Sequence, residues 1–199
     1  SVPYGEDTAK NGEWVPGPGD KLFKAMKEAL GPLAIVAENL GVITPEVEAL
    51  RLGQGLPGMV VLQFEVGEAE FDMSSIDDNS VCYTGTHDND TTPGWFRGNG
   101  DDTRTVEDMK REQANTLAIT GGTPETIHMD MIRLAYSSNS CLAIAPMQDY
   151  LGLGSEARLN TPGTTKDNWR WRMQDGALTP ELISTVADMV GSSSRTAAP

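Results

Sequence analysis

The sequence is short of the residues on which several classes of protein depend. Its 199 residues include two cysteines and two histidines, so we expect neither a disulfide framework nor a histidine-rich metal site. Only 15 basic residues stand against 29 acidic ones, and the net charge of −14 argues against binding to nucleic acid or to anionic membrane surfaces. No run approaches the roughly 20 apolar residues of a membrane helix, and no signal peptide is visible. The composition fits a neutral or weakly polar ligand.

Two further absences narrow the chemistry. No glycine-rich phosphate loop follows the first apolar run, as it would in a doubly wound nucleotide-binding sheet. No serine nucleophile elbow accompanies the two histidines, so a serine hydrolase triad is not expected. Cys82 and Cys141 each lie inside an apolar run, which predicts two buried free thiols.

The apolar pattern predicts strands that alternate with helices. Continuous apolar runs, typical of strands buried on both faces, occupy residues 33–37, 59–64, 81–84 and 141–145. Helices are predicted from about residue 20 to 30, between about 103 and 120, and after each of three Thr-Pro-Glu sequences at 44–46, 123–125 and 179–181. Residues 1–19 resemble a loop, and residues 191–199 resemble a disordered tail.

Four strands alternating with helices predict an α/β fold with a parallel sheet. Polar and acidic residues at the strand ends favour a barrel, but a complete (β/α)8 barrel has eight strands in typically about 250 residues. We therefore predict the C-terminal half, about four β/α units, of a (β/α)8 TIM-type barrel at residues 1–177, with a C-terminal helix and tail at residues 178–199. Two unpaired sheet edges lead us to expect that this chain folds poorly by itself.

Glu38 directly follows the apolar run 33–37. A carboxyl group held at the end of a buried strand would have a raised pKa, which is what a general acid near neutral pH requires. The alternative is a glutamate that has just reached solvent and caps the next turn.

A second polar segment, Thr-Gly-Thr-His-Asp-Asn-Asp at 84–90, begins at the end of the run 81–84. Asp88 could make only a local turn or a helix cap, but Asp90 is the better cap for a helix through Thr91 and Thr92, which leaves Asp88 for a pocket. His87 could bond either a ligand hydroxyl or a backbone carbonyl.

Several segments, in order along the chain, together resemble the 4-α-glucanotransferases of glycoside hydrolase family 77, also called disproportionating enzymes or amylomaltases. The resemblance runs from about Tyr4 to Met173. Its motifs include Asn-Gly-Glu-Trp at 11–14, the run 35–44, Leu-Pro-Gly-Met at 56–59, residues 83–92, and residues 145–169. One such motif would be weak evidence, whereas this many in the family's order is specific.

The resemblance implies that an α-1,4-glucan or malto-oligosaccharide is cleaved with retention of configuration, after which a second glucan attacks in place of water. It implies that Glu38 is the acid/base and that Asp88 stabilises the transition state. The implied substrate-binding residues are His87, Trp14, Asn39 and Asp90. It requires no cofactor or metal, and it implies a plastid or a bacterial cytoplasm as the compartment. The oligomeric state is left open. Trp14 suits a sugar face, although a tryptophan that packs under a loop would look the same.

The sequence also departs from the family pattern. The family's nucleophile, an Asp in an Arg-x-Asp-His segment, has no counterpart here, so we expect a C-terminal portion that is inactive by itself. Asn39 stands where the family usually has Asp, and residues 72–79 lack the family's Pro-His-Asn element. Two other functions stay open: a non-catalytic glucan-binding or scaffold remnant, and an α-amylase-like hydrolase.

Overall fold

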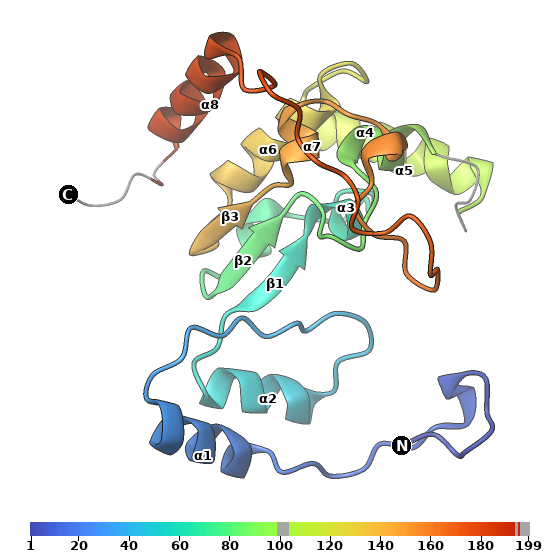
Figure 1. The fold of residues 1–199 in the computed structure, drawn as a ribbon, viewed down its shortest axis with the longest axis vertical. Helices are drawn as coiled ribbons and strands as arrows, with labels where there is room; N and C mark the ends of the chain where they lie inside the picture. Colours follow the sequence, from blue (N-terminus) through green and yellow to red (C-terminus); the bar gives the residue numbers. More distant parts are fainter. Residues whose placement is uncertain (99–103, 194, 196–199) are drawn as a thin grey trace. The chain divides into compact units, whose positions relative to one another are not determined.

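The computed structural model describes residues 1–98, 104–193 and 195, and it divides into two compact units, Ser1–Pro57 and Gly58–Pro199 (Figure 1). The first unit contains no strand among its residues, all of which are described, and the second unit contains a parallel sheet. The predicted α/β class with a parallel sheet is therefore confirmed. The predicted boundary between residues 177 and 178 stays a prediction.

The first unit consists of the short helix η1 (Ala9–Asn11), helix α1 (Asp20–Leu30) and helix α2 (Pro45–Gly53). Both longer helices lie where the sequence predicts them. Gly31 ends α1 with a φ of 75°, a conformation that glycine adopts without steric cost. The hydroxyl of Thr44 accepts a hydrogen bond from the Val47 amide at 3.4 Å and so caps α2.

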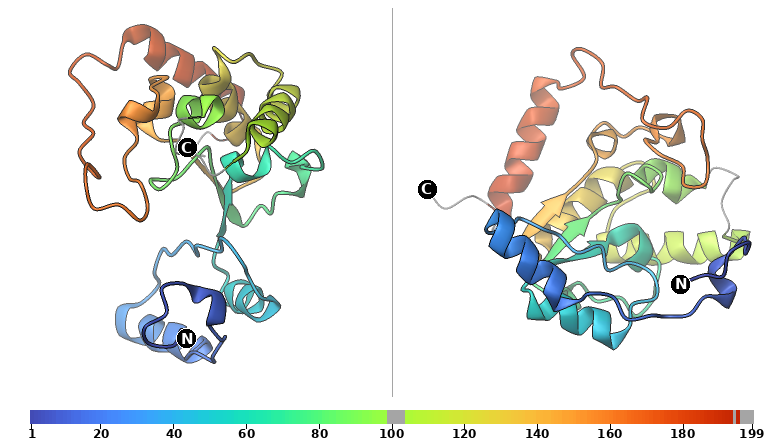
Figure 2. Two further views of the ribbon diagram at one scale, coloured as in Figure 1. Left: turned by 90° about the vertical axis from the view of Figure 1, so that its right-hand side faces the viewer. Right: turned by 60° about the horizontal axis from the view of Figure 1, so that its bottom comes forward.

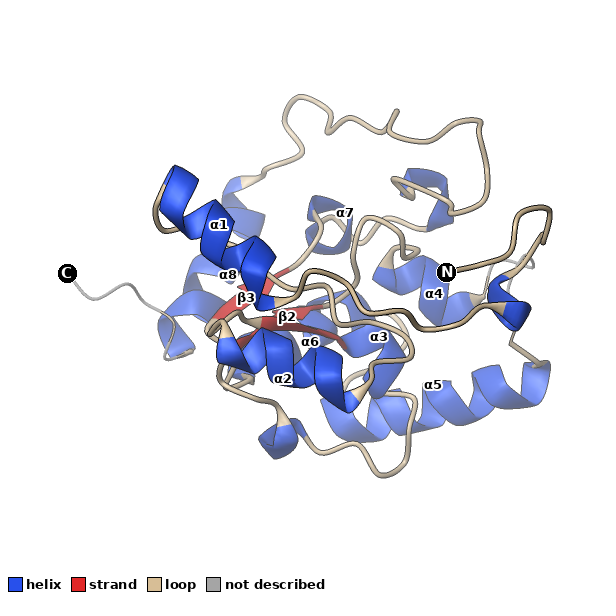
Figure 3. Cartoon of the chain, turned by 90° about the horizontal axis from the view of Figure 1, so that it is seen from below, coloured by secondary structure: helices blue, strands red, loops and turns tan. Residues whose placement is uncertain are grey.

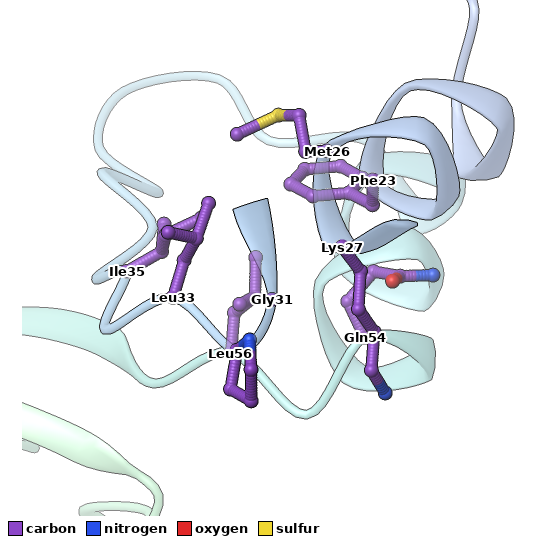
Figure 4. A pocket seen from close by; sticks show the side chains of 9 residues that line it. Phe23, Met26, Lys27, Gly31, Leu33, Ile35, Gln54 and Leu56 are labelled. Carbon is purple, nitrogen blue, oxygen red and sulfur yellow. The ribbon is translucent and has the colours of Figure 1, made fainter. Parts of the chain in front are cut away.

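This unit has almost no interior. Among residues 1–57, all of which the structure describes, Arg51 alone is buried. The apolar side chains of α1 are only partly covered, because Leu22 and Leu30 are exposed. Figure 4 shows Phe23 and Met26 of the same helix beside an open pocket that is also lined by Leu33, Ile35 and Leu56.

The strand predicted at residues 33–37 does not form. These residues have no regular secondary structure and belong to no sheet, and they are exposed or half-buried. A strand buried on both faces needs a neighbouring strand to satisfy its amides and carbonyls. In the first unit, the run instead has a single backbone bond of this kind to another segment, from the Ala37 amide to the Pro57 carbonyl at 2.8 Å.

The second unit is built on a parallel sheet with the strand order β1-β2-β3 (Figure 1). The strands are β1 (Gly58–Val61), β2 (Ser80–Tyr83) and β3 (Leu142–Ile144). Val60, Cys82 and Ala143 are aligned across the sheet. The described residues thus form three of the four predicted strands, and the half barrel of about four β/α units stays a prediction.

The first of these strands is shorter than the run 59–64 predicts. It ends at Val61, and helix α3 (Leu62–Glu65) follows. Leu62 and Val66 are fully buried, whereas Phe64 is 56% exposed. A strand would place all three side chains on one face, but a helical turn brings residues four apart together and leaves Phe64 outside. Burial of Leu62 and Val66 in one core therefore favours the helix.

Helix α6 (Ile127–Ser137) is the centre of this unit. It contacts α4 (Thr92–Arg97), α5 (Val106–Thr120), α7 (Met147–Tyr150), α8 (Pro180–Ser192) and β3. Figure 3, in which the strands are red, shows α3 and α6 next to the sheet. The buried core cluster joins the sheet to these helices and consists of Leu62, Val66, Cys82, Phe96, Ile127, Met131 and Ala135.

The third strand differs from its prediction in burial. Leu142 is 54% exposed and Ile144 is exposed as well, whereas Ala143, whose side chain points to the opposite face of β3, packs against the core. Cys141, at the start of this strand, is exposed, so the prediction of two buried thiols is wrong for Cys141 and confirmed for Cys82. Burial raises the pKa of the Cys82 thiol to about 11.

The remaining elements begin or end close to their predicted positions. Helix α5 begins at Val106, and Thr103, where it was expected to start, lies outside the described residues. Helix α6 begins at Ile127 and not at the Thr-Pro-Glu sequence, which forms a turn before it. Helix α8 continues to Ser192, two residues into the predicted tail, while residues 194 and 196–199 of that tail are not described. The short helices are η2 (Met73–Ser75) and η3 (Ser155–Ala157).

Candidate active site

The polar segment after β2 is anchored to the sheet before it becomes a loop. The Thr84 amide donates to the Ile144 carbonyl of β3, and the Gln63 amide donates to the Thr84 carbonyl, each at 3.3 Å. Gly85 comes so close to Gln63 that a Cβ atom there would lie 2.6 Å from the Gln63 side-chain nitrogen. The loop that follows therefore starts from a fixed point at the carboxyl end of the central strand, where α/β proteins commonly place functional groups.

The loop itself is closed by Asn89. Its side-chain oxygen accepts hydrogen bonds from the amide and the hydroxyl of Thr86, at 2.9 and 2.8 Å. The Asx-type contacts that the sequence allowed for Asp88 are thus made by Asn89. The carboxylate of Asp88 remains accessible, with 48% of its side chain exposed.

Asp88 is held from a distant part of the chain. The Asn160 side-chain amide donates to the Asp88 carboxylate at 2.6 Å, and the Arg158 guanidinium donates to the Asp88 carbonyl at 2.8 Å. His87 places its Nε2 atom 3.4 Å from the same carboxylate. Asn160 and Arg158 belong to the long irregular segment between η3 and α8 (Figure 2). This segment therefore orients Asp88 without covering it.

Trp169 comes from the same segment. Its ring centroid lies 5.3 Å from that of His87, with the ring planes tilted by 38°. The backbone of Trp169 has a φ of 63°, a left-handed conformation that is uncommon for a bulky residue. An exposed indole, an imidazole and a carboxylate thus lie close together, and this combination offers both an apolar face and hydrogen-bonding groups to a ligand.

Asp90 has a supporting role within the same loop. One of its carboxylate oxygens accepts from the Ser155 hydroxyl at 2.6 Å, and the other accepts from the Thr91 amide at 2.8 Å. The prediction that Asp90 caps the next helix is wrong. Thr91 is the N-cap of α4, because its hydroxyl accepts from the Gly94 amide at 3.1 Å.

The other three candidate residues lie in the first unit. Glu38 is exposed, and Asn39 is half-buried. Since the run before Glu38 forms no strand, the expectation of a buried carboxyl group at a strand end is wrong for this structure. Trp14 is 74% exposed in the loop between η1 and α1 and does not pack under a loop. The structure thus joins His87, Asp88 and Asp90 in one loop, while Glu38, Asn39 and Trp14 belong to the other unit.

A fully buried carboxylate, Asp149, was missed as a site residue. It accepts hydrogen bonds from the Thr84 hydroxyl at 2.6 Å, the Thr92 amide at 2.7 Å and the Thr92 hydroxyl at 2.8 Å. Burial raises its pKa, and the hydrogen bonds from Thr84 and Thr92 oppose that shift. Asp149 lies shortly after the apolar run 141–145, and this position near a strand end could have identified it as a candidate. Asn160 and Trp169 lie within the family-like segment 145–169, but their contacts with Asp88 and His87 could not be predicted from it, because these partners are distant in the sequence.

Within residues 1–98, 104–193 and 195, no group of three or more acidic, histidine or cysteine side chains is arranged to hold a metal ion. Nor does any helix of these described residues have the length and hydrophobicity needed to cross a bilayer.

Comparison with known proteins gives one consistent result. A family model described as 4-alpha-glucanotransferase, of glycoside hydrolase family 77, matches residues 1–179. The 4-alpha-glucanotransferase of Synechocystis is 48% identical over 198 residues, which cover 96% of this chain and 38% of that protein. The chloroplastic/amyloplastic 4-alpha-glucanotransferase of Arabidopsis thaliana is 44% identical over 176 residues, which cover 87% of this chain and 29% of that protein.

A solved structure agrees with these relatives. The amylomaltase from Streptococcus agalactiae, determined in complex with acarbose, matches with a TM-score of 0.79 and 34% identity, over 92% of this chain and 36% of that chain. The matched part of this chain therefore spans between 29% and 38% of the length of these relatives.

Proposed function

Because this chain belongs to the 4-alpha-glucanotransferase family, glycoside hydrolase family 77, we propose that it is the C-terminal portion of an enzyme that transfers α-1,4-glucan segments between malto-oligosaccharides. The observation that carries the proposal is the loop after β2. There Asp88 is exposed yet oriented by Asn160 and Arg158, with His87 and Trp169 beside it. An oriented carboxylate beside aromatic rings suits a sugar ring, which has hydroxyl groups at its edge and C–H groups on its faces.

The proposed reaction is a retaining double displacement. Glu38 protonates the oxygen of the leaving glucan and later removes the proton from the acceptor hydroxyl. Asp88 stabilises the oxocarbenium-like transition state, and His87 binds a hydroxyl group of the same sugar. Trp14, Asn39 and Asp90 complete the proposed substrate-binding set. The nucleophile is an Asp of an Arg-x-Asp-His segment that this sequence does not contain, and retaining enzymes place such a group about 5–5.5 Å from the acid.

We also propose that the chain forms part of a (β/α)8 barrel. β1 and β3 each have one neighbour in the described sheet, and the apolar run 33–37 belongs to no sheet. A closed barrel would give each of these segments a partner on both sides. In that arrangement, residues 33–37 become a strand and Glu38 takes up the strand-end position that the sequence predicts. The 199 residues alone are then expected to lack transfer activity. A plastid or a bacterial cytoplasm is the proposed compartment.

The test is maltotriose disproportionation by a longer form of the protein that includes the Arg-x-Asp-His segment. We expect glucose together with malto-oligosaccharides longer than the substrate. Glu38→Gln should lower the transfer rate by about 100- to 10,000-fold, the usual contribution of a general acid/base. Glu28→Gln, which removes an exposed carboxylate from α1 in the same unit, is the matched control and should keep full activity.

The products also separate this proposal from its alternatives. An α-amylase-like hydrolase would release glucose and shorter glucans without any longer product. A non-catalytic glucan-binding protein would bind maltotriose and form no product. Undiminished transfer by Glu38→Gln would refute the role given to that residue.

A further inference from the structure

One buried carboxylate connects the two ends of the loop that carries His87 and Asp88. Thr84, at one end, directly follows β2, and Thr92, at the other end, is the first residue of α4. Both threonines are fully buried, and both donate hydrogen bonds to the Asp149 carboxylate at 2.6–2.8 Å. Asp149 thus fixes the distance between the end of β2 and the start of α4 independently of the conformation of residues 85–91.

Asp149 is itself held by the central helix. Its backbone carbonyl lies 2.7 Å from Nδ1 of His128, which belongs to α6. A carbonyl oxygen can only accept, so His128 carries a proton on Nδ1 and donates it here. A second bond in the same region joins the hydroxyl groups of Tyr150 in α7 and Tyr136 in α6, at 2.6 Å. Because α6 holds the backbone of α7 in place, the Asp149 carboxylate is held in a fixed position beside the two ends of the loop.

A carboxylate suits this place better than an apolar side chain would. The Thr92 amide lies at the start of α4, where a backbone donor has no partner within the helix. Left unpaired in a buried site, that amide would cost about 1–3 kcal/mol. Three donors converge on the two oxygens of Asp149, which compensates for the loss of its hydration.

We propose that Asp149 is a positioning residue for the loop at residues 85–91, and that it acts on His87 and Asp88 through Thr84 and Thr92 without touching substrate. The kinetic part of this proposal rests on the proposed function. The reason is preorganisation, because catalysis depends on groups that are held within a fraction of an ångström of their working positions. Asn160 and Arg158 hold Asp88 from one side, and Asp149 holds both ends of its loop.

The test uses Thr84→Val and Thr92→Val in the longer form of the protein. Each removes one hydroxyl that donates to Asp149 and keeps the shape of the side chain. The matched control is Thr116→Val, which removes an equally buried hydroxyl that donates to the Glu112 carbonyl at 2.7 Å in α5. Thr84→Ser retains the hydroxyl and should behave like the wild-type protein in amide exchange and in kcat.

Two readouts are needed, and one of them does not depend on activity. Amide hydrogen exchange of residues 85–91, without substrate, should become faster by about tenfold in both valine variants and stay unchanged in Thr116→Val. For maltotriose transfer, kcat should fall by about tenfold while KM changes by less than about twofold. Exchange in residues 85–91 that matches the Thr116→Val control would overturn the proposal, as would an unchanged kcat. If the wild-type protein transfers no glucan, the proposed function fails, and the exchange measurement still decides whether Asp149 orders the loop.

Discussion

Two segments of this chain have the same sequence pattern and different structures. In each, an apolar run is followed directly by polar residues that include a candidate catalytic carboxylate: Glu38 after residues 33–37, and Asp88 after β2. β2 lies between two parallel strands and its first three residues are buried, whereas residues 33–37 belong to no sheet. An apolar run therefore forms a strand only where the rest of the chain supplies neighbouring strands to which its backbone can hydrogen-bond.

The same contrast holds for the two units as a whole. The second unit has a core of buried apolar side chains that joins the sheet to helices α3, α4 and α6. In the first unit, which is fully described, helices α1 and α2 have local caps but bury no apolar side chain completely. Caps start and stop a helix through local hydrogen bonds, and most of the stability of a helix in a protein comes from packing of its apolar face.

Amide exchange should show the largest difference between the two segments. In the 199-residue chain, the amides of residues 33–37 should exchange several orders of magnitude faster than those of β2, because few of them are hydrogen-bonded and none is buried. Hydrogen exchange followed by mass spectrometry measures this directly. Equal protection of the two segments would show that the run 33–37 is already paired.

The same measurement on the longer form of the protein tests the proposed barrel. If residues 33–37 become a strand there, their protection should rise toward that of β2, while β2 itself changes little. Unchanged fast exchange in the longer protein would contradict the proposed strand.

Core truncation should give the next largest difference. Leu62→Ala removes a fully buried side chain from the second unit and should lower the free energy of unfolding by about 2–5 kcal/mol. Leu33→Ala makes the same chemical change at an exposed position of the first unit and should cost less than about 1 kcal/mol. Urea unfolding followed by circular dichroism compares the two variants. Similar losses would mean that the first unit has a packed interior after all.

The helix caps should differ least. The Thr105 hydroxyl in the second unit accepts from the Asp108 amide at 3.1 Å and also donates to the Asp108 carboxylate at 2.7 Å. The Thr44 hydroxyl in the first unit accepts one longer bond, at 3.4 Å. Thr105→Ala should therefore cost about 1 kcal/mol and Thr44→Ala only a few tenths. A larger loss for Thr44→Ala, measured by the same urea unfolding, would reverse this order.

The cap of α5 should also depend on pH. The Thr105 hydroxyl, together with Arg111, lowers the pKa of Asp108 below its ordinary value of 3.8. A carboxyl group whose pKa is lower in the folded protein stabilises it above the unfolded pKa, and that contribution disappears as the pH falls through the folded pKa. The stability difference between the wild-type chain and Asp108→Asn should thus be present at pH 7 and disappear as the pH falls through the lowered pKa of the folded protein. A difference that persists at low pH would show that the charge is not responsible.

Features that depend on residues close together in the sequence could be predicted, and features that depend on distant residues could not. The helix starts at Thr44 and Thr179 were predicted correctly, because a cap is formed by residues three positions apart. The parallel sheet and the buried Cys82 were also predicted, since apolar runs indicate which side chains are removed from water. The family followed from motifs in order, and the comparison with known proteins confirmed it.

The tertiary structure decided everything that depends on residues far apart in the sequence. It ended β1 at Val61, left residues 33–37 without a sheet, and exposed Cys141 at the edge of β3. It also placed Asn160 on Asp88 across 72 residues, and it set Asp149 between Thr84 and Thr92. A sequence shows which side chains are apolar, charged or able to cap, but the partners of a strand or a buried carboxylate are chosen by packing. For this protein, the sequence determined the family and the local elements. Packing determined which carboxylates are hydrogen-bonded by distant residues, as Asp88 and Asp149 are, and which are exposed to solvent, as Glu38 is.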